Sequence, residues 1–471
     1  MSYKPTIGIE IHCELNTATK MFSGAPVRFG ETANTCTSVV DLAHPGTLPC
    51  VNKKAVELAI RACTGLHCQI DPLVKFDRKN YYYSDLPKGF QITQQFHPIG
   101  RDGYVEIETE EGPKKVRIER IHMEEDTAKQ FHKDTGTYID FNRAGVPLVE
   151  IVSRPDIANG KEAAAYVSAL REILFYLGVS DVKMEEGSMR CDVNISLSDS
   201  DELGTKVEVK NLNSIANVQK AVQAEIERQT ALLEAGEKVE QATRRYDEPS
   251  RSTVLMRKKE GTVDYKYFPE PNIFPIQLDA AWIEEIQDSL PELPGQRKER
   301  LMKDYGLNDY DAGVLVADKE LADFFEKAAK DSKDFKKTAN FVIVDSAAYL
   351  NKNNLKPADI MESAAGLGEL VNMLADGEIN SKQAKELFES VLQGENPKKL
   401  AEKKGMKQMD ESALKALVES VLDANPQSIE DFKNGKKRAV GFLVGQVMKQ
   451  SKGQANPKRA NELVSEALKG R

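Results

Sequence analysis

Acidic residues and a histidine alternate near the N-terminus, at Glu10, His12 and Glu14. Alternate residues of a β-strand project to one face, so we expect these three side chains to point the same way. Further carboxylates occur in three later segments, which are the run HMEED at residues 122–126, Glu150 and Asp192. Carboxylates that share a sheet face repel one another unless a cation joins them, and oxygen ligands with a single imidazole suit Mg²⁺ or Mn²⁺ better than Zn²⁺. The sequence therefore favours a magnesium site, with ordinary solvated residues on an outer face as the alternative.

The segment at residues 116–126 alternates like a strand, but its apolar phase slips between Ile118 and Ile121. One extra residue in a β-bulge would produce this slip, and bulges are common beside active sites. A regular strand sends Glu124 and Glu125 to opposite faces. Both can therefore serve one site only if the chain bends there.

Basic and aromatic residues are concentrated at residues 75–91. The side chains of Arg78, Lys79 and Lys88 could hold phosphates, and the three tyrosine rings at residues 81–83 could stack on a nucleobase. A tyrosine run is also typical of a half-buried strand, and this alternative stays open.

The elements that must position these residues alternate between strands and helices up to about residue 275. Residues 190–197 and 205–210 have apolar residues at every second position, which is typical of half-buried antiparallel strands. Helical periodicity covers residues 161–177 and 214–235, with Ser214 as the N-cap of the second stretch and a glycine directly after each. We expect both helices to cover one face of the sheet.

Beyond residue 296 the sequence shows almost only the 3.6-residue period of helices, for example at residues 319–330, 381–392 and 411–422. The predicted fold class is therefore α+β. A β-rich, largely antiparallel domain with flanking helices is followed by an all-α domain and a small helical tail. The predicted domains are residues 1–293, 294–406 and 407–471.

The charge is distributed unevenly along the chain. The formal net charge of −9 disfavours a nucleic-acid partner when it is taken as an average. From Asp431 onward, however, ten basic residues face three acidic ones, an excess of seven positive charges that leaves −16 on residues 1–430. Such asymmetry indicates a basic binding module on an acidic body, with a merely solvated basic helix face as the alternative.

The N-terminus shows no leader pattern, and no apolar stretch approaches the ~20 residues that a membrane-spanning helix needs. Six cysteines without a CxxC pair favour reduced thiols. We therefore expect a cytoplasmic protein without a membrane partner. The sequence also lacks GxxxxGK[ST], GxGxxG and HExxH motifs and the Gly-Ser-Ser run that an amidase nucleophile needs.

Eight motifs, in order along the chain, resemble those of the B subunits of tRNA-dependent amidotransferases. They are IGIEIH (7–12), FDRKNY (76–81), HMEED (122–126), VKMEEGSMRCD (182–192), EVKNLN (208–213), YKYFPE (265–270), GFLVGQVMK (441–449) and KGQANP (452–457). The resemblance covers nearly the whole chain, and several of these motifs are too long to recur by accident.

The resemblance implies a β-rich cradle domain, a helical domain and a small helical tail, in agreement with the boundaries above. It implies a reaction that uses ATP and Mg²⁺, or Mn²⁺ in its place, to phosphorylate the side-chain carboxylate of Glu-tRNA(Gln) or Asp-tRNA(Asn) and then amidates it with ammonia. The expected partners are an amidase (A) subunit that supplies the ammonia, a small (C) subunit, the misacylated tRNA and the cognate non-discriminating aminoacyl-tRNA synthetase.

The same resemblance implies the site residues. The expected metal ligands are Glu10, His12, Glu124, Glu125 and Glu150, and Asp192 is expected to support them. The candidates for ATP phosphate contacts are Lys79, Arg190 and Lys210. The residues assigned to tRNA phosphates are Lys436, Lys437, Arg438, Lys449 and Lys452. Some members of the family carry paired cysteines that resemble a zinc site, whereas residues 34–41 contain only Cys36, so zinc is not expected here.

Two other functions fit parts of the same pattern. Acidic clusters with Mg²⁺ also cleave phosphodiesters, so a magnesium-dependent RNA phosphodiesterase is one alternative. A non-catalytic tRNA-binding scaffold with structural carboxylates is the other.

Overall fold

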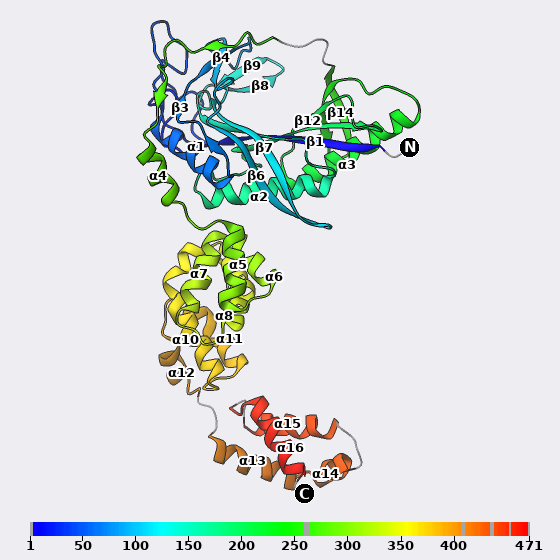
Figure 1. Ribbon diagram of the computed structural model, residues 1–471. Coiled ribbons are helices and arrows are strands. Elements are labelled where there is room, and N and C mark those ends of the chain that lie inside the picture. Colours follow the sequence, from blue (N-terminus) through cyan, green and yellow to red (C-terminus); the bar gives the residue numbers. More distant parts are fainter. Residues whose placement is uncertain (1–2, 259–263, 407–409, 434–437, 452–453, 470–471) are drawn as a thin grey trace. The chain divides into compact units, whose positions relative to one another are not determined.

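The computed structural model describes residues 3–258, 264–406, 410–433, 438–451 and 454–469. The chain forms two compact units, Met1–Leu293 and Pro294–Arg471 (Figure 1). The first contains every described strand, and all described secondary-structure elements of the second are helices.

A nine-stranded sheet forms the centre of the first unit. Its strands, in spatial order, are β14 (Ser252–Lys258), β13 (Ala242–Asp247), β12 (Val207–Lys210), β11 (Met189–Ser198), β1 (Lys4–Glu14), β10 (Pro147–Ser153), β7 (Gly112–Glu125), β6 (Gly100–Thr109) and β2 (Gln69–Ile70). Neighbours pair antiparallel except β12 and β13, which pair parallel. The predicted α+β fold with a largely antiparallel sheet is confirmed.

One face of this sheet is apolar because its strands alternate in the predicted way. On β1, Ile7, Ile9 and Ile11 are buried, whereas Glu10 and His12 project to the other face. The apolar face is covered by α1 (Lys53–Gly65), α2 (Gly160–Tyr176) and α3 (Ile215–Glu234), which contribute to one continuous core (Figure 1). The opposite face is thus left for polar side chains.

The two long helices lie within one residue of their predicted ends. The Ser214 hydroxyl accepts a hydrogen bond from the Asn217 backbone N–H at 3.1 Å, as expected of an N-cap. Gly178 and Gly236 follow the helices in the left-handed region, with φ of +66° and +75°. α2 packs on β6 and on α3, and α3 packs on β11, so both cover the sheet as predicted.

The predicted bulge is present in β7. Opposite β10, Arg120 pairs with Val152 while Ile118 pairs with Ser153, so Glu119 is the extra residue. Opposite β6 the pairing continues in register through Arg120 and Ile118.

Three smaller sheets complete the first unit. They are β15 (Phe268–Pro269) with β4 (Asp77–Asn80) and β5 (Phe90–Thr93), β16 (Ile276–Gln277) with β3 (Leu73–Val74), and the hairpin of β8 (Lys129–Lys133) and β9 (Gly136–Asp140). Helix α4 (Ala280–Asp288) packs on α1. The tyrosine run begins one residue after the end of β4, so it does not form a half-buried strand, and Tyr82 is 89% exposed.

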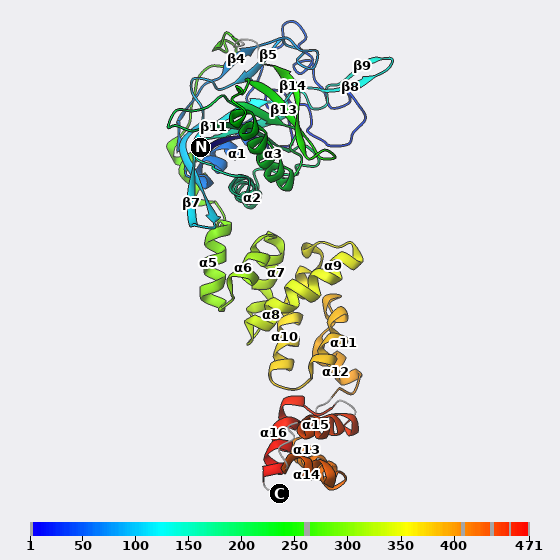
Figure 2. The same cartoon turned by 90° about the vertical axis from the view of Figure 1, so that its right-hand side faces the viewer.

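The second unit consists of consecutive helices (Figure 2). They are α5 (Pro294–Tyr305), α6 (Asp309–Val316), α7 (Lys319–Ala329), α8 (Phe335–Asn340), the π-helix Phe341–Ser346, α9 (Ala347–Asn353), the 3₁₀ helix Pro357–Ser363, α10 (Ala364–Ala375), α11 (Ser381–Leu392), α12 (Pro397–Lys403), α13 (Glu411–Asp423), α14 (Pro426–Lys433), α15 (Arg438–Gln450) and α16 (Pro457–Lys469). The three helices predicted at residues 319–330, 381–392 and 411–422 agree with α7, α11 and α13 to within one residue.

Helices α13, α15 and α16 share a hydrophobic cluster of their own, which includes Val421, Leu443 and Val464. The predicted boundary between residues 406 and 407 adjoins residues 407–409, which lie outside the described residues. A separate tail domain therefore stays a prediction.

Candidate functional site

Two rows of polar residues cross the sheet face opposite the helices. Residues that oppose one another on paired strands share a face. In the first row His12 opposes Arg190 on β11 and Glu150 on β10, and Glu150 in turn opposes His122 on β7. In the second row Glu10 opposes Asp192. Residues distant in sequence are thus brought together by the pairing of β11, β1, β10 and β7.

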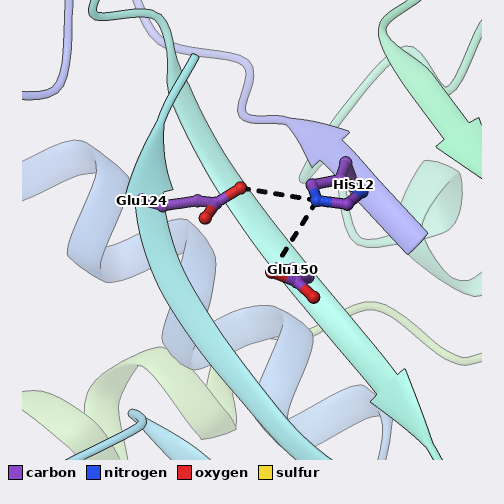
Figure 3. A group of neighbouring side chains, drawn as sticks. All are labelled: His12, Glu124 and Glu150. Carbon is purple, nitrogen blue, oxygen red and sulfur yellow. Dashed lines mark ion pairs between the residues drawn. The ribbon is translucent and has the colours of Figure 1, made fainter. Parts of the chain in front are cut away.

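The first group consists of His12, Glu124 and Glu150, which come from three neighbouring strands (Figure 3). His12 Nε2 lies 3.7 Å from Glu124 Oε1 and 3.7 Å from Glu150 Oε2. The two carboxylates are 4% and 13% exposed, and His12 is 23% exposed. The alternative of ordinary solvated carboxylates is therefore wrong for Glu124 and Glu150, and the imidazole is the more accessible member.

This group fits a divalent cation. Ligands about 2.1 Å from one Mg²⁺ lie roughly 3 Å apart when adjacent and roughly 4 Å apart when opposite. The 3.7 Å separations fall within that range. Two buried carboxylates beside an imidazole also match the ligand types of Mg²⁺ and Mn²⁺.

His122 completes this group and was not among the predicted ligands. Its Nε2 lies 3.0 Å from Glu150 Oε2 and 3.8 Å from Glu124 Oε2. Burial lowers the pKa of His122, but the charge of Glu150 and hydrogen bonds to both carboxylates outweigh it and raise the pKa to about 9. Its position two residues before Glu124 was the signal that could have placed it on this face.

The charge on Glu150 is stabilised by these neighbours. Burial raises the pKa of Glu150, but the charge and hydrogen bond of His122, and then the charges of His12 and Lys79, lower it below the usual range. The carboxylate is therefore ionised and available to a cation.

A second group consists of Glu10, Asp192 and Glu208. Glu10 Oε1 accepts a hydrogen bond from Asn194 Nδ2 at 2.8 Å. Burial and the charge of Glu150 raise the pKa of Glu10. Glu208 was not predicted, although its outward position on β12 follows from the alternation of that strand.

The predicted phosphate ligand Lys210 already neutralises this second group. Its Nζ lies 2.5 Å from Asp192 Oδ2 and 3.0 Å from Glu208 Oε1. Burial lowers the pKa of Lys210, and the two carboxylates raise it to about 12, so it stays charged.

Glu125 lies apart from both groups, which corrects the prediction that all six residues cluster. Its carboxylate forms an ion pair with Lys88 and accepts a hydrogen bond from the Ile92 backbone N–H at 3.1 Å. The physical reason is strand alternation: β7 continues as a regular strand through Glu124 and Glu125, so their side chains leave on opposite faces. The bulge lies five residues earlier and does not bring them together.

Lys79 faces the first group from β4. The charges of Glu124 and Glu150 act on it, and although burial lowers its pKa, these charges raise the pKa above the usual value. Its Nζ lies 4.9 Å from the centre of the Tyr265 ring and 5.8 Å from that of Tyr81. An ammonium group thus lies near two tyrosine rings, where the charges of the two carboxylates act on it.

Arg190 extends the first row on the other side. Its Nη2 lies 2.8 Å from Asp126 Oδ2. Burial and the charge of Asp126 raise the pKa of the adjacent Glu14 to about 7, although Arg190 lowers it. Arg190 thus provides a cation at one end of the row, and Lys79 provides another from β4, outside the nine-stranded sheet.

The chain matches two protein-family descriptions. Residues 5–284 match the GatB/GatE catalytic domain, and residues 323–468 match the GatB domain. The B subunit of the aspartyl/glutamyl-tRNA(Asn/Gln) amidotransferase of Limosilactobacillus fermentum is 48% identical over 474 residues, with both chains covered completely. The protein of the same name from Bacillus licheniformis is 49% identical over 476 residues, again with complete coverage. The chain belongs to this family of amidotransferase B subunits.

The site lies in the part that matches the catalytic domain of this amidotransferase family. Every residue of the two carboxylate groups falls within residues 5–284. The chain is thus a component of a tRNA-dependent amidotransferase, an enzyme of the ligase class. No helix among the described residues is both long and apolar enough to span a membrane.

The tail of this family member presents some of the predicted basic residues. Arg438 and Lys449 are exposed on α15. Gly441 and Gly445 lie on the same helix face as these two residues. Apart from the glycine, its two neighbours and the helix's own nearby backbone, no described atom lies within 4 Å of a Cβ built at either position. The other predicted tail residues, Lys436, Lys437 and Lys452, lie outside the described residues.

Proposed function

We propose that this chain uses ATP and Mg²⁺ to activate the side-chain carboxylate of Glu-tRNA(Gln), Asp-tRNA(Asn) or both, and amidates it with ammonia from a partner amidase subunit. The supporting observation is the group of His12, Glu124 and Glu150 on the sheet face, near Lys79, with Glu124 buried and the other two partly exposed. It lies in the domain that the family description calls catalytic. In this proposal the chain works in the cytoplasm, with a small C subunit and the cognate synthetase as further partners.

Activation is needed because a carboxylate oxygen is a poor leaving group. The substrate carboxylate takes the γ-phosphoryl group of ATP and ADP leaves; ammonia then attacks the acyl carbon and phosphate leaves. Phosphoryl transfer depends mainly on positioning and charge neutralisation, and bound Mg²⁺ supplies both. His12, Glu124 and Glu150 are the residues that would hold this cation.

The chain's own cations have a separate task in this proposal. Lys79 and Arg190 are the cations that would contact phosphate oxygens. Lys79 lies near the Tyr265 ring, and Arg190 is oriented by its ion pair with Asp126. Lys210 already forms ion pairs with Asp192 and Glu208, so a phosphate would compete with these two carboxylates for its ammonium group. Glu10 and Asp192 support the site from the second row.

The test is Glu150→Gln in the assembled complex, because this change keeps the shape and removes the charge. We expect ATP-dependent phosphate release and amidation to fall by at least about 100-fold, while glutamine hydrolysis by the partner and tRNA binding persist. The matched control is Glu106→Gln, an exposed carboxylate on β6 that pairs with Lys115 on the neighbouring strand. An unchanged amidation rate would refute the assignment.

The same assay separates the alternatives. Shortened RNA in place of released phosphate would indicate a phosphodiesterase. Full activity of the Glu150→Gln variant, with tRNA binding intact, would indicate a scaffold.

We further propose that α15 contacts tRNA phosphates through Arg438 and Lys449, with Lys436, Lys437 and Lys452 nearby in sequence. The open face over Gly441 and Gly445 would let a phosphate backbone approach the helix. Changing Arg438 and Lys449 together to glutamine should weaken tRNA binding and reduce the salt slope by about two. An unaltered affinity and salt slope in a chain truncated after Gly405 would remove this part of the proposal.

A further inference from the structure

The β8–β9 hairpin is inserted between two strands of the candidate site. The chain leaves the sheet at the end of β7, just after Glu124, and returns at the start of β10, three residues before Glu150. Figure 2 shows the hairpin extending away from the rest of the first unit. Phe131 on β8 lies six positions after Glu125, so at most about 20 Å of extended chain connects them.

The base of the hairpin is fixed by hydrogen bonds to an earlier loop. The Asn34 backbone N–H donates to Asp140 Oδ1 at 3.1 Å, and Asn34 Oδ1 accepts from the Phe141 backbone N–H at 2.8 Å. Arg143 Nε donates to the Thr127 carbonyl at 2.9 Å on the other side. The base of the hairpin is therefore held against this loop and against the segment that follows β7.

One face of the hairpin carries two aromatic rings and two lysines. Phe131 and Tyr138 oppose one another across the strands and are 41% and 52% exposed. Lys129 Nζ lies 5.3 Å from the centre of the Phe131 ring, and Lys133 Nζ lies 5.1 Å from that of Tyr138. The other face carries the polar pair of residues 132 and 137.

Exposed rings beside ammonium groups match the chemistry of a single-stranded nucleic acid. Bases stack on aromatic faces, and the neighbouring lysines can pair with backbone phosphates. A protein partner fits less well, because burying the two ammonium groups in a dry interface would be costly and lysine is depleted in such interfaces.

We infer that the exposed rings of the cross-strand pair Phe131 and Tyr138 form a stacking platform for unpaired nucleotides near the 3′ end of the tRNA, and so direct its aminoacyl end toward Glu124 and Glu150. This inference rests on the proposed function, since it takes the tRNA as substrate. It adds a binding surface on the insertion between β7 and β10, in addition to the one proposed on α15.

The experiment measures binding of two tRNA(Gln) transcripts to the assembled complex. One transcript ends in CCA, and the other lacks its last four nucleotides. We expect the unaltered protein to lose about tenfold in affinity on truncation of the RNA. The double variant with Phe131→Ala and Tyr138→Ala should bind the full transcript as weakly as the unaltered protein binds the short one. Its affinity should not fall further when the RNA is shortened.

The matched control is His132→Ala with Thr137→Ala, the adjacent cross-strand pair on the opposite face. It should keep the full truncation effect. Equal binding of both transcripts by the unaltered protein, or a truncation effect that survives in the aromatic variant, would overturn the inference. Loss of subunit assembly with unchanged tRNA binding would assign the platform to a protein partner instead, which also overturns it.

Failure of this inference is distinguishable from failure of the proposed function. At saturating tRNA the aromatic variant should still release phosphate from ATP, whereas Glu150→Gln should not. If the aromatic variant shows a normal truncation effect and Glu150→Gln is inactive, the stacking platform is refuted and the proposed function stands.

Discussion

The two carboxylate groups on the sheet face differ in what balances their charge. Glu10, Asp192 and Glu208 lie against the ammonium group of Lys210, which is in contact with two of them. Glu124 and Glu150 lie instead against the imidazoles of residues 12 and 122. An imidazole can itself bind a metal ion, whereas an ammonium group cannot, so the first group is the stronger candidate for the metal.

The two groups should differ most in how the loss of one carboxylate affects Mn²⁺ affinity. In Glu124→Gln we expect Mn²⁺ affinity to fall at least about 100-fold and amidation to fall further, because a direct ligand is lost. In Glu208→Gln, where Lys210 and Asp192 remain paired, Mn²⁺ affinity should fall less than about tenfold. Electron paramagnetic resonance of bound Mn²⁺ measures both, and equal losses would contradict the comparison.

Removing the charge of Glu125 instead of that of Glu124 tests whether the position of a carboxylate, and not its charge alone, decides the Mn²⁺ affinity. Glu125→Gln should leave Mn²⁺ affinity within about threefold of the original value. Instead it should lower the free energy of unfolding by about 2–3 kcal/mol, because Lys88 loses its partner in a mostly buried ion pair. Urea unfolding measures this loss, and an Mn²⁺ affinity as low as that of Glu124→Gln would show that Glu125 does reach the metal.

Removing the internal cation should make the second group resemble the first. Lys210→Met should lower the free energy of unfolding by about 1–2 kcal/mol in the presence of chelator, less than for a fully buried pair because about a third of the lysine is exposed. Millimolar Mg²⁺ should restore part of this loss by binding the freed carboxylates. Thermal unfolding with and without Mg²⁺ measures the effect, and identical losses in both conditions would argue against cation replacement.

The smallest effect should come from a neutral neighbour of the second group. Asn194→Ala removes the hydrogen bond to Glu10 and should cost about 1 kcal/mol of stability. Amidation should change by less than about threefold, as measured in the same assay. A larger fall in amidation would mean that Glu10 must be held in place for the reaction.

Local periodicity predicted much of the fold. Alternation placed Glu10 and His12 on the polar face of β1. Ser214 marked the start of α3, and Gly178 and Gly236 marked the ends of α2 and α3. These features depend on neighbours in sequence, so a single chain contains the signal.

Pairing between distant strands could not be predicted in the same way. Nothing near His12 in sequence shows that it lies between Arg190 and Glu150, because the strand order is set by tertiary packing. The position of Lys88 beside Glu125 could not be predicted either. Glu125 was assigned to the site through the family resemblance, on the condition that the chain bends between it and Glu124. His122 was left out of the predicted site, although strand alternation already placed it on the same face as Glu124.

The extra residue Glu119 has a consequence for the whole row on β7. Val116 and Ile118 precede Glu119 on β7, and their side chains point into the core. If every second side chain after them did the same, His122 and Glu124 would point into the core as well. The insertion reverses the phase, so Ile121 and Met123 take the core positions instead. If β7 kept all of its residues but formed no bulge, the histidine and the glutamate would turn toward the helices and the next glutamate would take their side. Deleting this one residue would instead remove the need for a bulge and leave both side chains on the polar face.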